Sequence, residues 1–345
     1  MEDYGGQDDV NLNNVSAGES SVVRLSQSAA VTVVYIVIVC LALLSNALVI
    51  IVMLARRQDF SSFTNRLILH QSVIDSIAAL LLLLLRVVKN SSIPLSQEDN
   101  ALDQLICRVL ETDVLLWWSY VASTYCLVII SLERFVATCY PVKHRCSWSA
   151  SRLKYAVATP WALSAIYCWP AAVILRELHQ GQCLYVKSVS FYVMYGLAGI
   201  IVEFLVPVSI MTYAYARILI ILTRKLANPV NGRHLSKAKK NVLITSVFTG
   251  VMFLVCWTPL MLYNLFGVFV HLGVVVASEP GFDVIGLITC MAACSTFVNP
   301  VVYCFMYERF RSQLKDLVVK RCRRNQVGDG DPISINTATL EVTHD

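Results

Sequence analysis

The sequence predicts an all-α integral membrane protein, a seven-transmembrane helix bundle followed by a short amphipathic eighth helix. Three observations support this prediction. Hydrophobic residues make up 57% of the 345 residues, charged residues make up 15%, and the mean hydropathy is +0.62; a water-soluble domain needs a more polar surface. Seven stretches reach the ~20 apolar residues that cross the hydrocarbon core of a bilayer. Finally, the basic residues gather in alternate connections between these stretches.

Each apolar stretch is expected to be a helix, because lipid offers backbone N–H and C=O groups no other hydrogen-bond partners. The predicted spans are residues 28–54, 66–88, 105–132, 153–175, 190–222, 241–270 and 282–305. The chain is thus divided into an extracellular amino-terminal tail (1–27), the bundle (28–305), an amphipathic membrane-surface helix (306–322) and a disordered cytoplasmic tail (323–345).

The basic residues predict the orientation of the bundle. Of the 28 Lys and Arg residues, all but six lie on one side of the predicted spans, and those six are Arg24, Arg86, Lys89, Arg108, Arg176 and Lys187. Positive residues stay on the cytoplasmic side, so we expect the amino terminus outside and the carboxyl terminus inside the plasma membrane. The net charge of +5 then belongs to loops beside membrane lipids and predicts no nucleic-acid partner.

The amino-terminal tail is polar and acidic, so we expect no cleavable signal peptide and assign that role to the first span, as a signal anchor. Asn14-Val15-Ser16 is a glycosylation sequon in this tail, and Asn90-Ser91-Ser92 is a second one after span two. The alternative for both is a chance occurrence, because such triplets are common.

Two of the twelve cysteines fall on the predicted outer side. Cys107 lies at the outer end of span three and Cys183 in the loop between spans four and five. An oxidising compartment favours a disulfide between them, which would hold that loop over the mouth of the bundle. The alternative is two free thiols.

Glu133-Arg134-Phe135 places a charged pair where span three leaves the bilayer. An ionisable residue at this position is costly and is a functional hypothesis by default. One interpretation is a local ion pair that holds the buried guanidinium until another group displaces it. The other is an arginine that extends its head group to the membrane surface at a helix end.

Asp75 lies midway along span two between leucine-rich segments, where an isolated carboxylate needs partners. Asn46, Ser123, Ser295 and Asn299 are polar residues at similar depth in spans one, three and seven. They are expected to complete a hydrated cluster or a small cation site. The alternative is an uncharged, hydrogen-bonded core with Asp75 protonated.

Prolines recur inside the spans, and three of them are singled out as expected helix kinks. They are Pro207 in span five, Pro259 in span six and Pro300 in span seven. Trp257 lies beside the second kink and Tyr303 one turn after the third. Kinked helices with bulky side chains at the bend can pack in two ways, which suits a conformational switch, although proline is also ordinary in static membrane helices.

Taken together, these motifs resemble those of the rhodopsin-like (class A) G-protein-coupled receptors, over residues 28 to about 320. The matching residues are Asn46, Asp75, Glu133-Arg134-Phe135, Trp161, Pro207 with Tyr215, Phe253 with Cys256-Trp257-Thr258-Pro259, and Asn299-Pro300 through Tyr303. After them, Phe310, Leu314 and Leu317 form one face of the amphipathic helix.

The resemblance implies a receptor whose extracellular ligand favours an outward movement of span six, which opens a cleft for a heterotrimeric G protein. Arg134, Tyr215 and Tyr303 would line that cleft. Phe253, Trp257 and Pro259 would form the toggle below the ligand. The cluster around Asp75 would hold an allosteric Na⁺, with no other metal and no required cofactor.

The resemblance also implies modifications after the seventh span. Cys322 follows the amphipathic helix as a palmitoylation site. A receptor kinase and arrestin would act on the tail, whose phosphate acceptors are Ser334, Thr337, Thr339 and Thr343.

Three departures from the family pattern limit this inference. Glu133 and Phe135 stand where Asp and Tyr are usual. Lys239 in span six stands where some members carry an acid that restrains the arginine, so that contact between helices is absent and we predict a loosely held inactive state with basal signalling. Cys107 precedes Arg134 by 27 residues, two more than usual, so either span three bulges at its outer end or its register differs.

The ligand is predicted from the outer half of the bundle. Leu116 lies where amine receptors carry an aspartate, and Ala293 where an opsin carries the retinal-binding lysine, which argues against both classes. Thirteen acidic residues on the outer side outnumber six bases and favour a cationic ligand such as a basic neuropeptide. They are Glu2, Asp3, Asp8, Asp9, Glu19, Glu98, Asp99, Asp103, Glu111, Asp113, Glu177, Glu279 and Asp283.

The alternative explanation of these acids is a set of solvated loops, and the alternative function is a receptor of the same fold for a lipid or another small molecule. Glu203, one turn before Pro207, is expected to pair with a ligand cation or with Arg86, or else to be protonated and bonded to a neighbouring helix. The candidate ligand pocket comprises Arg86, Leu116, Trp117, Glu203, Met261 and Asn264.

Two other function classes fit less well. A transporter or channel requires repeated halves or interrupted helices, and no repeat is evident. An enzyme requires a nucleophile motif, a phosphate-binding loop or clustered metal ligands, whereas the six histidines are scattered. The chain is therefore predicted not to be an enzyme.

Overall fold

The computed structural model describes residues 9–90, 100–110, 112–174, 176–179, 182–185, 189–226, 237–276 and 282–328. Some side chains within its helices are outside this description, among them those of Asn14, Asn90, Lys239 and Cys322. The predictions on glycosylation and palmitoylation therefore fall outside the described side chains, as does the predicted tail from residue 329 onward.

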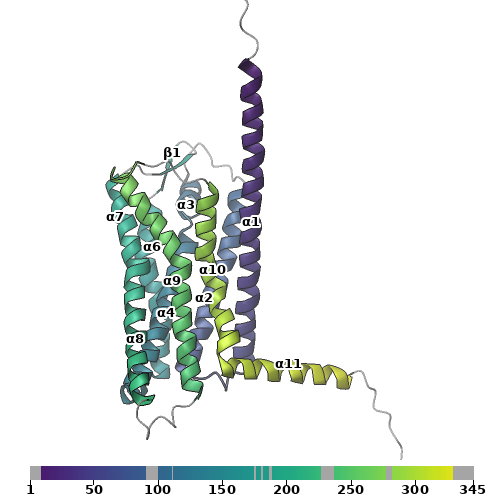
Figure 1. The fold of residues 1–345 in the computed structure, drawn as a ribbon, viewed down its shortest axis with the longest axis vertical. Helices are drawn as coiled ribbons and strands as arrows, with labels where there is room; N and C mark the ends of the chain where they lie inside the picture. Colours follow the sequence, from purple (N-terminus) through teal and green to yellow (C-terminus); the bar gives the residue numbers. More distant parts are fainter. Residues whose placement is uncertain are drawn as a thin grey trace, which may run out of the picture.

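Helices build almost all of the described chain (Figure 1). They are α1 (Asp9–Ala55), α2 (Phe63–Asn90), α3 (Ala101–Val109), α4 (Val114–Cys139), α5 (Pro141–Ser147), the 3₁₀ turn η1 (Ala150–Arg152), α6 (Leu153–Ile174), α7 (Val189–Gly199), the π-helical η2 (Ile200–Leu205), α8 (Val206–Leu226), α9 (Lys237–His271), α10 (Phe282–Met306) and α11 (Glu308–Gly328). Strands β1 (Arg176–His179) and β2 (Gln182–Tyr185) form one antiparallel hairpin.

Seven segments of these helices are long and apolar enough to cross a membrane. They are Ala30–Ala55, Phe63–Arg86, Ala101–Cys139, Leu153–Ile174, Val189–Ile221, Val247–His271 and Val284–Met306. Each overlaps one predicted span, so the predicted seven-transmembrane helix bundle is confirmed. Span three consists of α3 and α4, and span five consists of α7, η2 and α8.

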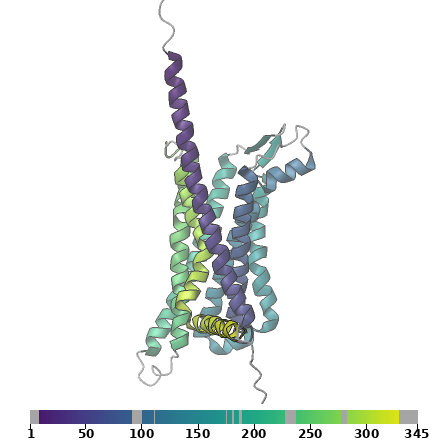
Figure 2. The same ribbon diagram turned by 90° about the vertical axis from the view of Figure 1, so that its right-hand side faces the viewer.

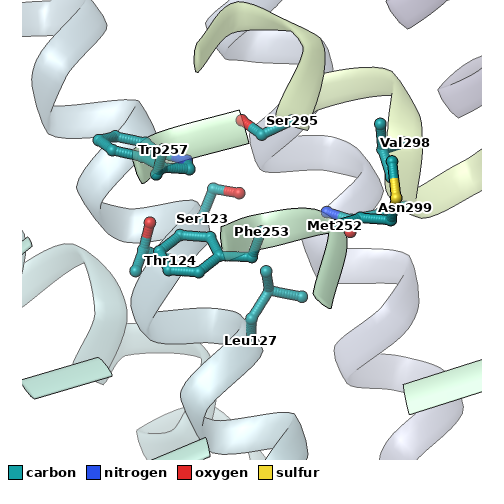
Figure 3. Close-up of a pocket in the computed structure, with 9 residues that line it drawn as sticks. All are labelled: Ser123, Thr124, Leu127, Met252, Phe253, Trp257, Ser295, Val298 and Asn299. Atoms are coloured by element: carbon teal, nitrogen blue, oxygen red, sulfur yellow. The ribbon is translucent and has the colours of Figure 1, made fainter. Parts of the chain in front are cut away.

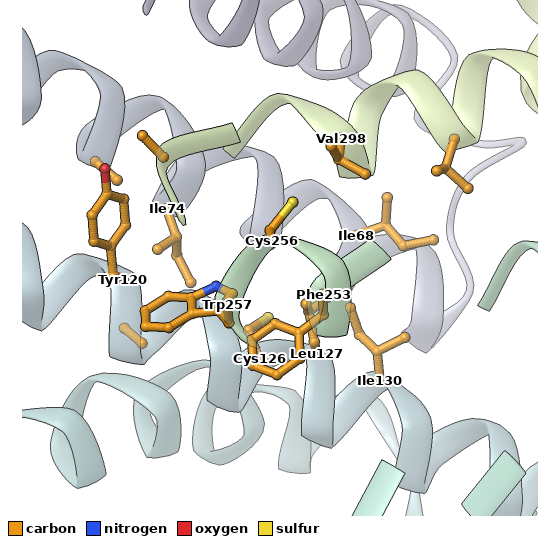
Figure 4. Packing of buried hydrophobic residues seen from close by; sticks show 14 of the residues in the cluster. Ile68, Ile74, Tyr120, Cys126, Leu127, Ile130, Phe253, Cys256, Trp257 and Val298 are labelled. Carbon is orange, nitrogen blue, oxygen red and sulfur yellow. The ribbon is translucent and has the colours of Figure 1, made fainter. Parts of the chain in front are cut away.

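Helix α4 is the centre of the bundle, because it packs against α2, α6, α8 and α9. The core around it contains Trp257, Phe253, Ile74 and Tyr120, whose side chains interdigitate in Figure 4. On the outside, large apolar side chains such as Ile166 remain 74% exposed. Lipid tails cover such a surface as favourably as a protein core does.

The amino-terminal end of span three contains a break. Helix α3 ends at Val109 and α4 starts at Val114, and Asp113 at the junction has a left-handed φ of 53°, which Asp tolerates better than most residues. The two extra residues between Cys107 and Arg134 are therefore accommodated by interrupting the helix. Of the two explanations for this spacing, the bulge is the one that the structure shows.

The predicted disulfide joins Cys107 of α3 to Cys183 of β2, with the Cα atoms 5.6 Å apart. Strand β1 contacts both α3 and α6, so the hairpin lies over one end of the bundle, as Figure 1 shows. We call this end the disulfide end, and the opposite end, which carries Glu133 and Arg134, the Arg134 end.

Helices α1 and α11 both extend beyond their predicted limits. Helix α1 begins at Asp9, before the predicted start at residue 28, and projects past the other helices in both views (Figures 1 and 2). No proline interrupts residues 9–29, so the helical hydrogen bonding continues into the polar segment. Helix α11 continues to Gly328, so residues 323–328, predicted to be disordered, are helical, and this helix lies across the end of the bundle.

The start of α11 is anchored in the core, as the amphipathic pattern predicts. Phe310 is fully buried, with its ring centroid 6.4 Å from that of Phe60. The Tyr307 hydroxyl, just before the helix, donates a hydrogen bond to Asn65 Oδ1 at 3.1 Å. Leu314 and Leu317 pack against the same core.

Candidate functional site

Glu133 is the most constrained charge at the Arg134 end. Its side chain is 3% exposed, and Oε1 lies 2.8 Å from Nε2 of His144 in α5. Its other oxygen, Oε2, lies 3.7 Å from Arg134 Nε, a separation too long for a hydrogen bond. Glu133 is thus shared between two basic groups and is held more closely by the histidine than by the neighbouring arginine.

His144 was missed by the sequence reasoning, which treated it as one of the scattered histidines. Pro141 at the first turn starts the short helix α5, and this helix returns His144 to the end of α4. The Trp148 ring stacks on His144 at 6.3 Å and meets Phe63 of α2 edge-on at 5.0 Å. These contacts fix α5 against the bundle and so fix the histidine beside Glu133.

The other residues predicted to act in coupling gather near Arg134. Phe135 packs against Tyr140 and Tyr213 at 5.8 Å each. Tyr215 of α8 and Tyr303 of α10 are buried, 8% and 4% exposed. In this arrangement the two tyrosines are part of the core instead of lining an open cleft.

Gly250 brings Tyr215 close to span six. A Cβ atom at position 250 would lie 3.0 Å from Tyr215 Cε2, so the absence of a side chain lets the ring pack directly on the α9 backbone. Helix α9 therefore contacts span five at this level without a spacer.

The three predicted toggle residues lie in the middle of α9. The Trp257 side chain is 1% exposed, and its ring centroid lies 5.8 Å from that of Phe253 and 6.4 Å from that of Trp117. Pro259 lies inside the helix, where it removes one backbone hydrogen bond. Trp257 thus sits between the kink and an aromatic residue of α4.

Asp75 is fully buried and surrounded by hydrogen-bond donors. Ser123 donates to Oδ1 at 2.7 Å and Asn299 Nδ2 donates to Oδ2 at 3.2 Å. Asn46 and Ser295, the other predicted members, donate instead to backbone carbonyls, of Ala42 and Thr296 for Asn46 and of Ala292 for Ser295. The structure therefore brings Asp75, Ser123 and Asn299 into one cluster and leaves Asn46 and Ser295 outside it.

Gln71, which the sequence reasoning also missed, completes the cluster. Its Nε2 lies 3.1 and 3.2 Å from the two oxygens of Asp75 and 2.5 Å from Ser123 Oγ. A hard cation requires oxygen ligands, and the carboxylate and hydroxyl oxygens that would supply them already surround an amide nitrogen. The residues in this arrangement do not fit a sodium ion. The sequence did contain a signal for Gln71, because its spacing of four residues from Asp75 puts both side chains on one helix face.

A small cavity separates this cluster from the toggle. Its volume is about 10 Å³, room for about one water molecule, and Ser123, Phe253, Trp257 and Asn299 are among its lining residues. In Figure 3 Trp257 and Ser295 lie at one side of the cavity and Leu127 at the other. A movement of Trp257 would therefore change the cavity that borders Ser123 and Asn299 of the Asp75 cluster.

A larger cavity lies toward the disulfide end. Its volume is about 260 Å³, and α4, α6, α7, η2 and α9 contribute to it. Trp117, Glu203 and Asn264, three of the six predicted pocket residues, line it, together with Tyr167, Tyr192 and Tyr195. A concave site lined by apolar and aromatic side chains with a few convergent polar groups is typical of small-molecule pockets.

The π-helical segment η2 places Glu203 in this cavity. A π-helical turn shifts the following residues around the helix axis and often occurs at functional sites. The Tyr125 hydroxyl of α4 donates to the Val202 carbonyl at 3.0 Å and anchors the segment. Glu203 is 7% exposed, and its carboxyl group accepts a hydrogen bond from the Tyr167 hydroxyl.

Gly199 makes room for that tyrosine. A Cβ atom at position 199 would lie 2.8 Å from the Tyr167 hydroxyl, closer than real Cβ contacts allow. The Tyr167 and Tyr195 rings stack at 5.3 Å. Glycine at this position therefore lets an aromatic wall and a carboxyl group meet at one side of the cavity.

The remaining predicted pocket residues lie elsewhere. The Arg86 guanidinium donates to the Tyr35 hydroxyl at 3.0 Å and lies 4.2 Å above the Tyr35 ring. The predicted alternative of a pair between Arg86 and Glu203 is therefore wrong, because the two residues lie on different sides of the bundle. Leu116 and Met261 are buried in the main core, 7% and 4% exposed, and do not line the cavity.

Comparison with known proteins identifies the family. The family model "7 transmembrane receptor (rhodopsin family)" matches residues 45–303, well over half of the chain. The chain is 27% identical to trace amine-associated receptor 1 of Mus musculus over 61% of this chain and 67% of that protein. It is 25% identical both to somatostatin receptor type 2 of Mus musculus (62% and 58%) and to melatonin receptor type 1A of Gallus gallus (64% and 62%).

These matches cover from 58% to 67% of the relatives' own lengths. The relatives are receptors and not enzymes, which confirms the prediction that the chain is not an enzyme. The extent of the family match, the seven apolar helices and the motif residues at their expected depths agree. The chain belongs to the rhodopsin family of seven-transmembrane receptors.

Proposed function

We propose that this receptor binds an extracellular ligand through a positively charged group and responds by activating a heterotrimeric G protein. The observation that supports the ligand class is the carboxyl group of Glu203 at the wall of the larger cavity. A carboxylate removed from water is stabilised by a cationic partner, and the tyrosine rings beside it attract cations through their π faces.

The proposed orientation puts the disulfide end outside the cell. A disulfide persists in an oxidising compartment, and the basic residues concentrate at the Arg134 end, as expected for a cytoplasmic face. The cavity then opens toward the extracellular side of the plasma membrane, below the hairpin that Cys183 ties to α3. Arrestin and a receptor kinase are proposed partners of the cytoplasmic tail.

The volume of the cavity suits one ammonium or guanidinium group with a small body. A basic peptide fits this proposal if one side chain enters the cavity and the rest contacts the acidic surface; a small amine fits it directly. The relatives are named for a trace amine, a peptide hormone and melatonin, so similarity does not choose between these sizes. We propose a positive charge as the feature that the ligands of this receptor share.

A chain of contacts leads from the cavity to the Arg134 end. Trp117 lines the cavity and contacts the Trp257 ring, which contacts Phe253 next to the kink of α9. A ligand that presses on Trp117 favours a second packing of α9, in which this helix moves outward from α8 and uncovers Arg134. The ligand need only bind that packing a few kcal/mol more tightly.

Replacement of Glu203 by Gln tests the ligand class. Monoamines, polyamines and basic peptides are screened on cells that carry the receptor and a promiscuous G-protein reporter. For a cationic agonist found in this way, Glu203→Gln is expected to lower the potency at least ~30-fold, because loss of one partner of a buried charge pair costs ~2 kcal/mol or more.

Arg86→Gln is the matched control, since Arg86 is engaged with Tyr35 on another side of the bundle; it is expected to leave potency unchanged at equal surface expression. Agonists that are all neutral or anionic, or cationic agonists that act equally on Glu203→Gln, would contradict the proposal.

A further inference from the structure

The Gln71 side chain lies between Asp75 and Ser123 in the centre of the bundle. Gln71 and Asp75 are fully buried, and Ser123 is 9% exposed. The amide Nε2 is 2.5 Å from Ser123 Oγ and 3.1 and 3.2 Å from the carboxyl oxygens of Asp75. Of the described residues, Gln71 is the one that contacts both groups from the same helix as Asp75.

The hydrogen atoms of this amide account for all three distances. An amide nitrogen carries two hydrogens; one points to the Asp75 carboxylate, shared between its two oxygens, and the other points to Ser123. The Ser123 hydroxyl is then free to donate to Asp75 Oδ1, and Asn299 donates to Oδ2. Three neutral side chains thus surround the carboxylate with donors.

The opposite orientation of the amide is unfavourable. It would place the carbonyl oxygen of Gln71 against both carboxylate oxygens, where only acceptors would meet. In the orientation observed, the carbonyl oxygen Oε1 has no hydrogen-bond partner among the described atoms. The contacts of the nitrogen with Asp75 and Ser123 therefore determine the position of the side chain.

A sodium ion bound between Asp75 and Ser123 would need the oxygen atoms that the Gln71 amide contacts, and the small cavity beside the cluster is lined by Ser123 and Asn299 but not by Asp75. The carboxylate and the Ser123 hydroxyl are the nearest oxygen ligands for such an ion, and N–H hydrogens between them repel a cation. To admit the ion, the Gln71 amide nitrogen would have to leave Asp75 and Ser123, and this nitrogen would then be a second unpaired polar atom beside Oε1, which is costly.

We propose that the Gln71 amide replaces the sodium ion at Asp75, so that the resting arrangement of this receptor is held by an internal hydrogen-bond donor and does not respond to sodium. The biological meaning of this proposal rests on the proposed receptor function. The contacts of Gln71 involve neither the ligand nor the G protein. A test on the purified protein can therefore contradict the sodium proposal without bearing on the proposed receptor function.

The test measures the thermal unfolding midpoint of the purified full-length receptor in NaCl and in KCl at about 0.15 M. The wild-type midpoints are expected to agree within ~1 °C, because an ion that binds neither state leaves the midpoint unchanged. Gln71→Leu is expected to gain a sodium-specific rise of ~2–4 °C, the shift that binding of one weakly held ion produces in a domain of this size.

Two further variants control the measurement. The double variant Gln71→Leu with Asp75→Asn is expected to lose the sodium-specific rise, since the ion would lose its carboxylate ligand. Ser76→Ala removes a hydroxyl of the same helix that donates to the Ser72 carbonyl, and it is expected to behave as the wild type does.

A sodium-specific rise in the wild type overturns the proposal, and this result is available even if Gln71→Leu does not fold. A rise in the wild type that Gln71→Leu abolishes would show instead that Gln71 turns its carbonyl oxygen to the ion as a ligand. A folded Gln71→Leu protein whose unfolding midpoint shows no sodium-specific rise would mean that Gln71 does not exclude the ion. This result would also overturn the proposal.

Discussion

Replacing Arg134 by alanine is expected to abolish ligand-dependent G-protein activation while the receptor still reaches the cell surface. The Arg134 side chain is only 20% exposed and lies near the end of α4. In the proposed active packing it becomes the central positive group of the newly opened cleft. Buried arginines at the centre of an interface contribute ~2 kcal/mol or more to binding, so coupling should fall at least ~30-fold.

The measurement is G-protein dissociation in cells, normalised to surface expression of an epitope-tagged receptor. Arg311→Ala is a suitable control, because this exposed arginine lies on α11 at the same end of the bundle and has no place in the proposed cleft. Full signalling by Arg134→Ala at normal expression would exclude the mechanism. Equal loss in the two variants would point to general electrostatic attraction of the partner instead.

Glu133→Gln is expected to raise signalling in the absence of ligand. Glu133 holds Arg134 through an ion pair at 3.7 Å, shared with His144 at 2.8 Å. Neutralising the carboxylate removes the electrostatic restraint on the arginine. A partly buried pair of this length contributes ~1 kcal/mol, so the active fraction should rise ~5-fold.

His144→Ala separates this explanation from a general loosening of the structure. Without the histidine, the buried carboxylate has Arg134 as its remaining basic partner among the described residues, so the pair should tighten and basal signalling should fall or stay low. His144→Gln, which keeps a hydrogen-bond donor near Glu133, should resemble the wild type. Basal cyclic-nucleotide or calcium signals are compared among the three variants at matched expression. A higher basal signal in His144→Ala would show that the histidine itself restrains the inactive state.

The seven helices and their main motif positions were predictable because an apolar stretch of this length can cross a bilayer only as a helix. Pro259 with Trp257, and Glu133 with Arg134, occur at the predicted levels for the same reason: their places along a helix follow from the count of residues. The spacing of Cys107 also revealed an irregularity at the amino-terminal end of span three, although counting residues did not distinguish a break in the helix from a different register.

The contacts that the sequence could not predict depend on the rotation of helices about their axes, on side-chain rotamers and on tertiary packing. Glu203 faces a cavity because η2 is π-helical, which no residue in Ile200–Leu205 indicates by its type. Gln71 reaches Ser123 of another helix through one of several available rotamers. His144 meets Glu133 only because α5 folds back after Pro141, a reversal that is set by tertiary packing.

The π-helical segment has a consequence for how span five changes over evolutionary time. One residue more than an α-helix needs rotates everything on one side of η2 by about 100° relative to the other side. The half with Tyr192 and Tyr195 and the half with Tyr215 are therefore out of helical phase with each other. Insertion or loss of a single residue between them is expected to turn Glu203 from the cavity toward lipid and to leave the contact of Tyr215 with Gly250 in place. The proposed ligand contact can therefore change without a change in the proposed coupling surface.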